Sequence, residues 1–338
     1  MSIDSPWGTG KTTFVKMFKK YLENSGFPCI YYNAWENDFS NDALVSLISE
    51  IETGICSLKL NTAENKAIKK QFEEVKNIGT KLAKYIIPSA IKIVTQGLLD
   101  LDKITEETLS KFAEEVAKEE IKKYENSKQN LLKFRKRLKD LVEEISKVDK
   151  YSNKPIVIFI DELDRCRPLF AIEILEKAKH FFNTQGIIFV LSTDKEQITH
   201  SISTIYGKGM ESGGYLRRII DLNYTLPIPS KGEFTRYLFI KYDFTEFFNQ
   251  RNHHELRYDS DHISFIFTEL STIFNLSLRD QAQCFTQLSI AMRMTRSDQY
   301  IDGIPLTFLI ILKLVNKELY YNFISGSDNA NTIIKHLE

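Results

Sequence analysis

The stretch SPWGTGKT, residues 5–12, follows the pattern G-x-x-x-x-G-K-[ST] except at its first position, where Ser5 replaces glycine. Gly8 and Gly10 give the backbone a tight path, so that successive N–H groups at a helix N-terminus can surround a phosphate. Lys11 adds a positive charge, and the hydroxyl of Thr12 can ligate Mg²⁺. The pattern predicts a phosphate-binding loop, although a near-match of this kind also fits an ordinary capped helix.

The residues around this loop indicate alternating strands and helices. Ser2–Asp4 is expected to form a strand stub, which is short for the strand that aims the loop from the centre of a sheet. A helix over 12–24, a strand over 28–33 and a helix that starts at Asp42 should follow. In the first helix, five apolar residues are expected to face inward: Phe14, Val15, Phe18, Tyr21 and Leu22.

A second motif, PIVIFIDELDR, occupies residues 155–165. Its unbroken apolar run is typical of a strand that is buried on both faces of a parallel sheet. Asp161 would end this strand and hold the hydration shell of Mg²⁺, and Glu162 would polarise the attacking water as a general base. The structural alternative is that both acidic residues only cap the next turn.

The stretch LSTD, residues 191–194, ends another predicted buried strand that begins at Ile187. Ser192 or Thr193 could contact a γ-phosphate or the attacking water, but either could equally be a plain exit from the strand. Asp194 is expected to cap the following helix, with Gln197 at the third helical position.

Three arginines are candidates for neutralising charge on a phosphate. Arg217 and Arg218 follow the glycine-rich segment 207–214, which is expected to be a mobile loop, and precede a strand expected over 219–226. Arg279 lies in the C-terminal helical part. Each could stabilise the transition state of phosphoryl transfer or merely form a salt bridge.

The whole pattern predicts an α/β fold with a doubly covered, mainly parallel sheet. We divide the chain into a first core part at 1–57, a helical insertion at 58–150, a second core part at 151–231 and a C-terminal helical lid at 232–338. Within the insertion, apolar residues recur at steps of three and four and predict a helix that packs on another helix: Leu131, Phe134, Leu138, Leu141, Ile145 and Val148.

Composition narrows the function classes. Lys plus Arg and Asp plus Glu number 45 each, so the net charge is zero and argues against a broad nucleic-acid footprint. A basic cluster at 133–139 is better explained as the solvated flank of a coiled coil. The segment 82–101 is amphipathic; we expect it to pack against protein rather than lie in a membrane interface, and a membrane span is not expected.

Few residues suit a structural metal or a disulfide. The four cysteines are far apart and form no C-x-x-C pair, which favours a reducing cytoplasm. The pair His253–His254 and His262 lack a matching carboxylate frame, so no metal role is assigned to them. A guanine-reading N-K-x-D motif is absent from the sequence, which makes adenine the expected base.

Taken in order, these pieces resemble the KAP-type P-loop NTPases, an additional-strand class related to signal-transduction ATPases. The matching pieces are PWGTGKTTF, YYNAWEND, IVIFIDELDRC, FVLSTDKEQI, YLRRIIDLNYTLPIP and LKLVNKELYYNFISG. The resemblance implies a nucleotide contact along the loop, at Pro6, Trp7, Gly8, Thr9, Gly10, Lys11, Thr12 and Thr13. It also implies Mg²⁺ at Thr12 and Asp161, a variable insertion at 58–150, and a hallmark tryptophan at Trp35, for which we expect core packing.

Two functions remain open at this stage. The first is a slow, Mg²⁺-dependent cytoplasmic ATPase that acts as a conformational switch. The resemblance to bacterial members of the family implies a role in phage defence. The second is a non-hydrolysing, nucleotide-bound scaffold whose helical insertion binds a partner protein or a second copy of the chain. A third reading, an ATPase that acts on DNA, is disfavoured by the zero net charge.

Overall fold

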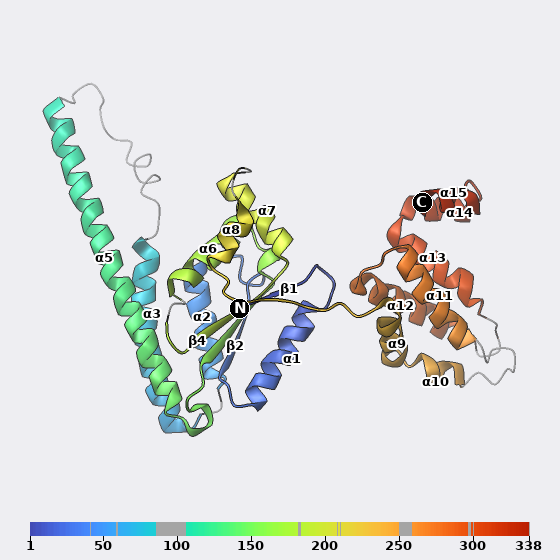
Figure 1. Cartoon of the computed structure of the whole chain (residues 1–338), viewed down its shortest axis with the longest axis horizontal. Coiled ribbons are helices and arrows are strands. Elements are labelled where there is room, and N and C mark those ends of the chain that lie inside the picture. The colour runs from blue at the N-terminus through green and yellow to red at the C-terminus, as the bar shows by residue number, and fades with distance from the viewer. Residues whose placement is uncertain are drawn as a thin grey trace. The chain divides into compact units, whose positions relative to one another are not determined.

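The computed structural model describes residues 1–40, 42–58, 60–85, 106–181, 184–207, 209, 211–249, 259–296, 299 and 301–337. The chain forms two compact units. The first comprises Met1–Asp4 and Thr12–Thr225, and the second comprises Ser5–Lys11 and Leu226–Glu338. Figure 1 labels the helices of both units and the strands β1, β2 and β4 of the first.

The first unit is built on a parallel sheet of five strands, in the order β2-β3-β4-β1-β5. The strands are β1 (Ser2–Asp4), β2 (Cys29–Asn33), β3 (Ile156–Asp161), β4 (Ile187–Thr193) and β5 (Asn223–Thr225). Parallel neighbours need crossover connections, and the intervening helices supply them. The predicted parallel sheet is thereby confirmed, and the stub Ser2–Asp4 is a strand between β4 and β5.

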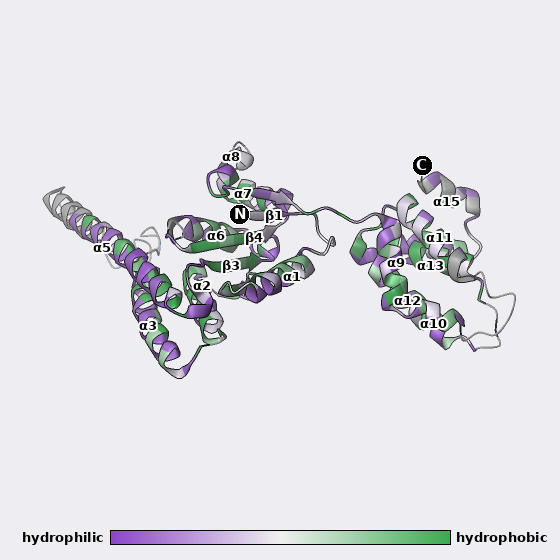
Figure 2. Ribbon diagram, turned by 60° about the horizontal axis from the view of Figure 1, so that its bottom comes forward, coloured by the Kyte–Doolittle hydropathy of each residue, from purple (hydrophilic) through white to green (hydrophobic). Residues whose placement is uncertain are grey.

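Helices cover both faces of this sheet. The helices nearest to it are α1 (Lys11–Asn24), α2 (Ala43–Cys56), α6 (Pro168–Phe181) and α7 (Lys195–Tyr206). Alternate residues of β3, Ile156, Ile158 and Ile160, join the main core with α2 and α6. The intervening Phe159 instead meets Phe18 of α1, with the ring centroids 5.8 Å apart. Figure 2 shows the hydrophobic colour concentrated on the strands.

The predicted helix pair between α2 and β3 consists of α3 (Thr62–Tyr85) and α5 (Glu106–Ser146), which lie side by side (Figure 1). The predicted seam is confirmed: Phe134, Leu138, Leu141, Ile145 and Val148 are buried, and Leu131 is partly buried. They meet Phe72, Val75 and Leu82 of α3 in one core. Arg137 of the basic cluster bridges to Glu74 at 2.8 Å. Residues 86–101 of the amphipathic segment lie outside the described residues.

Three expectations about local structure are wrong. The strand expected over 219–226 is only Asn223–Thr225, because its pairing partner β1 offers three residues. The glycine-rich segment is partly helical, since α8 spans Ser212–Arg217; Lys208 and Met210 lie outside the described residues. Tyr21 is 67% exposed rather than inward-facing, because it falls outside the buried stripe that Val15 marks on α1.

The second unit has its own core. Its helices are α9 (Lys231–Lys241), α10 (Phe244–Asn249), α11 (Asp259–Ile273), α12 (Leu278–Met294), α13 (Gly303–Val315), α14 (Lys317–Ile324) and α15 (Ala330–Leu337). The expected helical, aromatic-rich character is confirmed: Phe285 is fully buried and its ring lies 4.4 Å from that of Phe267. No helix in the described part of either unit is long and apolar enough to cross a membrane.

Candidate functional site

Four strands of the sheet carry a row of aligned residues at or next to their carboxyl ends. Asn33 of β2 pairs with Asp161 of β3, which pairs with Ser192 of β4, and Ser192 in turn pairs with Ile3 of β1. Because the strands are parallel, their carboxyl ends meet at one edge of the sheet, and this edge is where open α/β sheets bind ligands. The row therefore marks the candidate site of the first unit.

Asp161 is the fully buried carboxylate of this row. Its Oδ2 accepts a hydrogen bond from the Tyr31 hydroxyl at 2.9 Å, and its Oδ1 accepts one from the backbone N–H of Glu162 at 3.0 Å. Burial, and then the charge of Asp161, raise the pKa of Tyr31, so this hydroxyl stays protonated as a donor. Asp161 shares a strand face with Phe159, which is the face that α1 covers.

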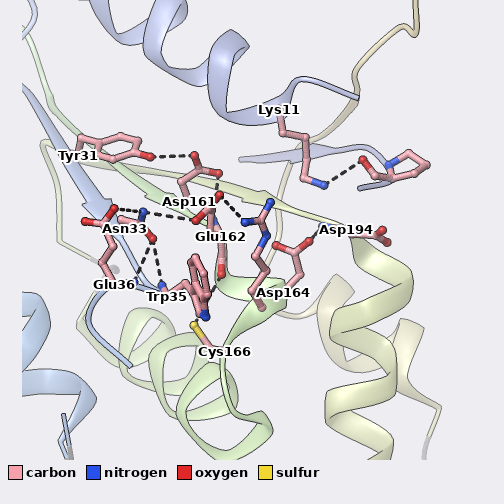
Figure 3. A network of polar contacts seen from close by, with 12 residues as sticks. Lys11, Tyr31, Asn33, Trp35, Glu36, Asp161, Glu162, Asp164, Cys166 and Asp194 are labelled. Atoms are coloured by element: carbon pink, nitrogen blue, oxygen red, sulfur yellow. Dashed lines mark hydrogen bonds and ion pairs between the residues drawn. The ribbon is translucent and has the colours of Figure 1, made fainter. Parts of the chain in front are cut away.

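Glu162 follows the strand in the left-handed backbone region, with φ 59°. Arg165 Nη1 lies 3.0 Å from Glu162 Oε1, and Asn33 Nδ2 donates to Glu162 Oε2 at 3.4 Å (Figure 3). The left-handed region costs a non-glycine residue about 1–2 kcal/mol, so the surrounding contacts must hold it there. Its side chain is 14% exposed, which leaves the carboxylate at the rim of the fold.

The turn after β2 lies against the turn after β3. Trp35 is 53% exposed, so the expectation that it packs in the core is wrong; the neighbouring Ala34 takes the buried position. The Arg165 guanidinium lies 5.7 Å from the centroid of the Trp35 ring. Arg167 ties the same turn down, because its Nε and backbone N–H bind the Asp38 carboxylate at 2.9 and 2.8 Å.

The predicted phosphate loop, Ser5–Lys11, connects β1 to α1. Gly8 and Gly10 have φ values of 81° and 91°, which only glycine adopts readily. Ser5 is not among the residues with positive φ, so this position does not need glycine. Its hydroxyl lies 2.7 Å from that of Thr9, which also donates to the Pro6 carbonyl at 2.7 Å. The loop is therefore held by its own hydroxyls.

Lys11 points into the loop rather than away from it. Its Nζ donates to the carbonyls of Ser5 at 2.5 Å and Pro6 at 3.2 Å, and the residue is 9% exposed. The first turn of α1 carries no acidic residue that would compete with an anion at the helix N-terminus. A bound phosphate group fits these features: two glycines with positive φ, a buried lysine, and a first helical turn without acidic side chains.

Ser192 and Thr193 are both buried, but they are not equivalent. Ser192 pairs directly with Asp161, so the two side chains lie on the same face, whereas Thr193 points to the other face. Among the described residues, the Ser192 hydroxyl has no hydrogen-bond partner. Asp194 caps α7 as expected, since its carboxylate accepts from the N–H groups of Glu196 and Gln197.

The three candidate arginines lie in different places. Arg217 ends α8 and pairs with Glu211 at 2.5 Å, with both side chains exposed. Arg218 is the residue that follows α8. Arg279 lies in the first turn of α12, inside the second unit, where a Cβ added at Gly8 would come 3.2 Å from the Arg279 Cβ.

Sequence reasoning missed three residues of the site: Tyr31, Asn33 and Arg165. Tyr31 and Asn33 stand in the YYN that ends β2, and Arg165 stands three residues after Glu162 in DELDR. Tyr31 and Asn33 become meaningful only once β2 is known to be the neighbour of β3, whereas the i,i+3 spacing of Glu162 and Arg165 is a local signal that the sequence already carries. Among the described residues, no group of three or more His, Cys, Asp or Glu could hold a metal ion.

Two comparisons place the chain among known proteins. It is 29% identical over 175 residues to an uncharacterised protein of Methanocaldococcus jannaschii, an alignment that covers 49% of this chain and 89% of that protein. A family model described as the KAP family P-loop domain matches residues 1–296, and this range includes the phosphate loop, the Asp161–Glu162 strand end and Arg279. The chain therefore belongs to the KAP family of P-loop domains.

Proposed function

We propose that this protein binds ATP with Mg²⁺, hydrolyses it slowly and uses the nucleotide as a conformational switch. The P-loop of the family implies nucleotide binding. The observation that carries hydrolysis is the pair at the end of β3: a fully buried Asp161, followed at once by a partly exposed Glu162. A metal-bound phosphate needs the first kind of carboxylate, and an attacking water needs the second.

Each residue of the proposed site has a distinct task. The N–H groups of the loop and the Lys11 ammonium bind phosphate oxygens, and the loop glycines Gly8 and Gly10 permit the path that this needs. Thr12 and Asp161 would hold Mg²⁺, which would neutralise charge on the phosphates. Glu162 orients the attacking water and takes its proton.

Further contacts to the γ-phosphate are proposed for one residue of the sheet and for one of the candidate arginines. Ser192 is preferred to Thr193, because its buried hydroxyl shares the face of Asp161 and has no partner among the described residues. Arg279 is preferred among the arginines, because it lies beside the loop glycine Gly8. Arg217 and Arg218 remain secondary candidates, and the exposed pairing of Arg217 with Glu211 favours a structural role for it.

The test removes the proposed base without removing its shape. Glu162→Gln should lower the ATP hydrolysis rate by about 10²–10⁴-fold, because the amide cannot accept the proton of water. ATP affinity, measured by calorimetric titration, should stay within about twofold of wild type. Lys11→Ala should instead abolish ATP binding. Glu143→Gln, on the solvent side of α5, is the matched control and should change neither quantity. Hydrolysis by Glu162→Gln at the wild-type rate would contradict the proposal.

A second candidate function is a nucleotide-bound scaffold that does not hydrolyse. The observation that favours it is that both carboxylate oxygens of Glu162 are already held, by Arg165 and Asn33. In this case the α3–α5 pair would bind a partner protein or a second copy of the chain. Tight ATP binding with no turnover, at every protein concentration tested, would select the scaffold.

The biological role that we propose is phage defence, which rests on the resemblance to bacterial relatives. Cells that express the wild-type chain should lower the plating efficiency of a sensitive phage, and cells that express Glu162→Gln at the same level should not. Equal plating on both would remove the link between hydrolysis and defence.

A further inference from the structure

We infer that Arg165 is a positioning residue for the proposed hydrolysis, and that Trp35 holds Arg165 in place. The inference rests on the proposed role of Glu162 as the base and assigns the two residues that set where its carboxylate lies. Trp35 is 53% exposed, so core packing does not explain this residue, and the inference gives it a task.

The first step is the contact between Arg165 and Glu162. Glu162 immediately precedes a short 3₁₀ helix, η3 (Leu163–Arg165), and the backbone N–H of Arg165 donates to the Glu162 carbonyl at 3.2 Å, which brings the two residues together. Arg165 Nη1 therefore lies 3.0 Å from Glu162 Oε1, with the arginine side chain 27% exposed and that of the glutamate 14% exposed. A planar guanidinium in a fixed geometry restricts the carboxylate more than a flexible ammonium would.

The second step is the support of Arg165 from the neighbouring strand. Trp35 belongs to the turn after β2, and its ring lies 5.7 Å from the guanidinium carbon of Arg165. The same turn is anchored by the side chain of Asn33: its Oδ1 accepts from the backbone N–H of Trp35 at 3.1 Å, and its Nδ2 donates to Glu162 Oε2 at 3.4 Å. An indole face is the aromatic surface that best attracts a guanidinium, so the Trp35 ring holds the Arg165 guanidinium in place.

The third step is the consequence for the reaction. Glu162 follows β3 in the left-handed region, and its carboxylate contacts Arg165 and Asn33. Without Arg165, only the longer 3.4 Å hydrogen bond from Asn33 Nδ2 restrains the carboxylate among the described residues, and a displacement of about 1 Å at a catalytic group can cost about 10²-fold in rate. Loss of Arg165 should therefore lower kcat and leave ATP binding almost unchanged, because neither Arg165 nor Trp35 is among the residues proposed to hold phosphate.

The experiment compares two arginines of the same turn in the full chain. Arg165→Ala should lower kcat for ATP hydrolysis by about 10–100-fold with KM and ATP affinity within about twofold of wild type. Arg165→Lys should recover part of kcat, because the charge returns without the planar stack. Arg167→Ala is the matched control. Arg167 also follows β3, but it binds Asp38 in the turn after β2 rather than Glu162, so the variant should lose stability but keep kcat. Arg165→Gln replaces the alanine variant if the latter does not fold, as judged by circular dichroism.

Trp35 is tested by a double-mutant cycle. Trp35→Leu should lower kcat by about 3–10-fold and Trp35→Phe by less, since a smaller aromatic face remains. Trp35→Leu combined with Arg165→Ala should be no slower than Arg165→Ala alone, because the ring acts only through the arginine. Effects that multiply in the double variant would overturn the role of Trp35.

Failure of this inference differs from failure of the proposed function. If Glu162→Gln abolishes hydrolysis but Arg165→Ala leaves kcat unchanged, raises it, or matches Arg167→Ala, the positioning role is overturned and the ATPase stands. A loss of ATP affinity that equals the loss of kcat overturns it as well. If the wild-type chain binds ATP without turnover, the proposed function and the inference fall together.

Discussion

The four cysteines show how burial sets the chemistry of single residues. Cys56 is exposed at the end of α2, whereas Cys29, Cys166 and Cys284 are buried and all four are free. Burial raises the pKa of Cys29 and of Cys284 to about 12, and burial together with the nearby Asp38 charge also raises the pKa of Cys166. Because the thiolate is the reactive form, the three buried thiols should be inert near neutral pH.

This difference predicts one reactive thiol in the folded protein. At pH 8 a chromogenic thiol reagent should modify a single cysteine quickly, and Cys56→Ser should remove that fast phase. Cys29 and Cys284 lose their protons only as the pH rises toward 12, so their reaction should speed up with pH, whereas denaturation should expose all four cysteines at once. Two or more fast thiols at pH 8 would contradict the buried positions.

At the scale of elements, one helical glycine controls how α2 packs on the sheet. A Cβ at Gly54 would come 2.6 Å from Cγ2, 2.9 Å from Cγ1 and 3.1 Å from Cβ of Ile30. Ile30 belongs to β2, is 1% exposed and is β-branched, so it has little freedom to turn away. Close approach, rather than helix propensity, therefore explains this glycine.

The expected result is that Gly54→Ala destabilises the first unit by about 1–3 kcal/mol, although alanine is favoured over glycine inside a helix by about 1 kcal/mol. Gly213→Ala in α8 is the control, because a Cβ there meets nothing within 4 Å. That variant should be neutral or stabilised by about 0.5–1 kcal/mol. Chemical denaturation measures both, and equal shifts for the two variants would refute the packing argument.

At the scale of the whole molecule, the two units have separate hydrophobic cores. Leu141 of α5 belongs to the core of the first unit, and Phe285 of α12 belongs to that of the second. Both side chains are almost completely buried, with exposures of 1% and 0%. Cores that share no residues can melt separately, so a single free energy of unfolding need not describe this chain.

Calorimetry should therefore resolve two unfolding transitions. Leu141→Ala should cost about 2–5 kcal/mol and lower the midpoint of one transition, and Phe285→Ala should cost about 3–5 kcal/mol and lower the other. ATP should raise the midpoint of at least one transition, since a ligand of the native state stabilises it. A single transition that both substitutions lower alike would show that the units unfold together.

Local patterns in the sequence were enough for most of the fold. The apolar run before Asp161 predicted β3, the steps of three and four from Leu131 to Val148 predicted the seam of α5, and Asp194 predicted the cap of α7. The candidate residues Lys11, Asp161 and Glu162 were chosen in the same way, from their spacing relative to strand and helix ends, and their roles stay predictions. These features depend on neighbours within a few residues along the chain.

Tertiary structure decided the remaining features, because they depend on which strands become neighbours. β5 is short because β1 pairs with it over three residues, and Trp35 is exposed because its turn lies at the rim of the sheet. The contacts of Glu162 with Asn33 and of Tyr31 with Asp161 join residues 129 and 130 positions apart, and they arise only from the order β2-β3. The sequence by itself determined which residues end the strands; only the packing of the sheet decided which of those ends meet, because hydrogen bonds between distant segments leave no periodic trace along the chain.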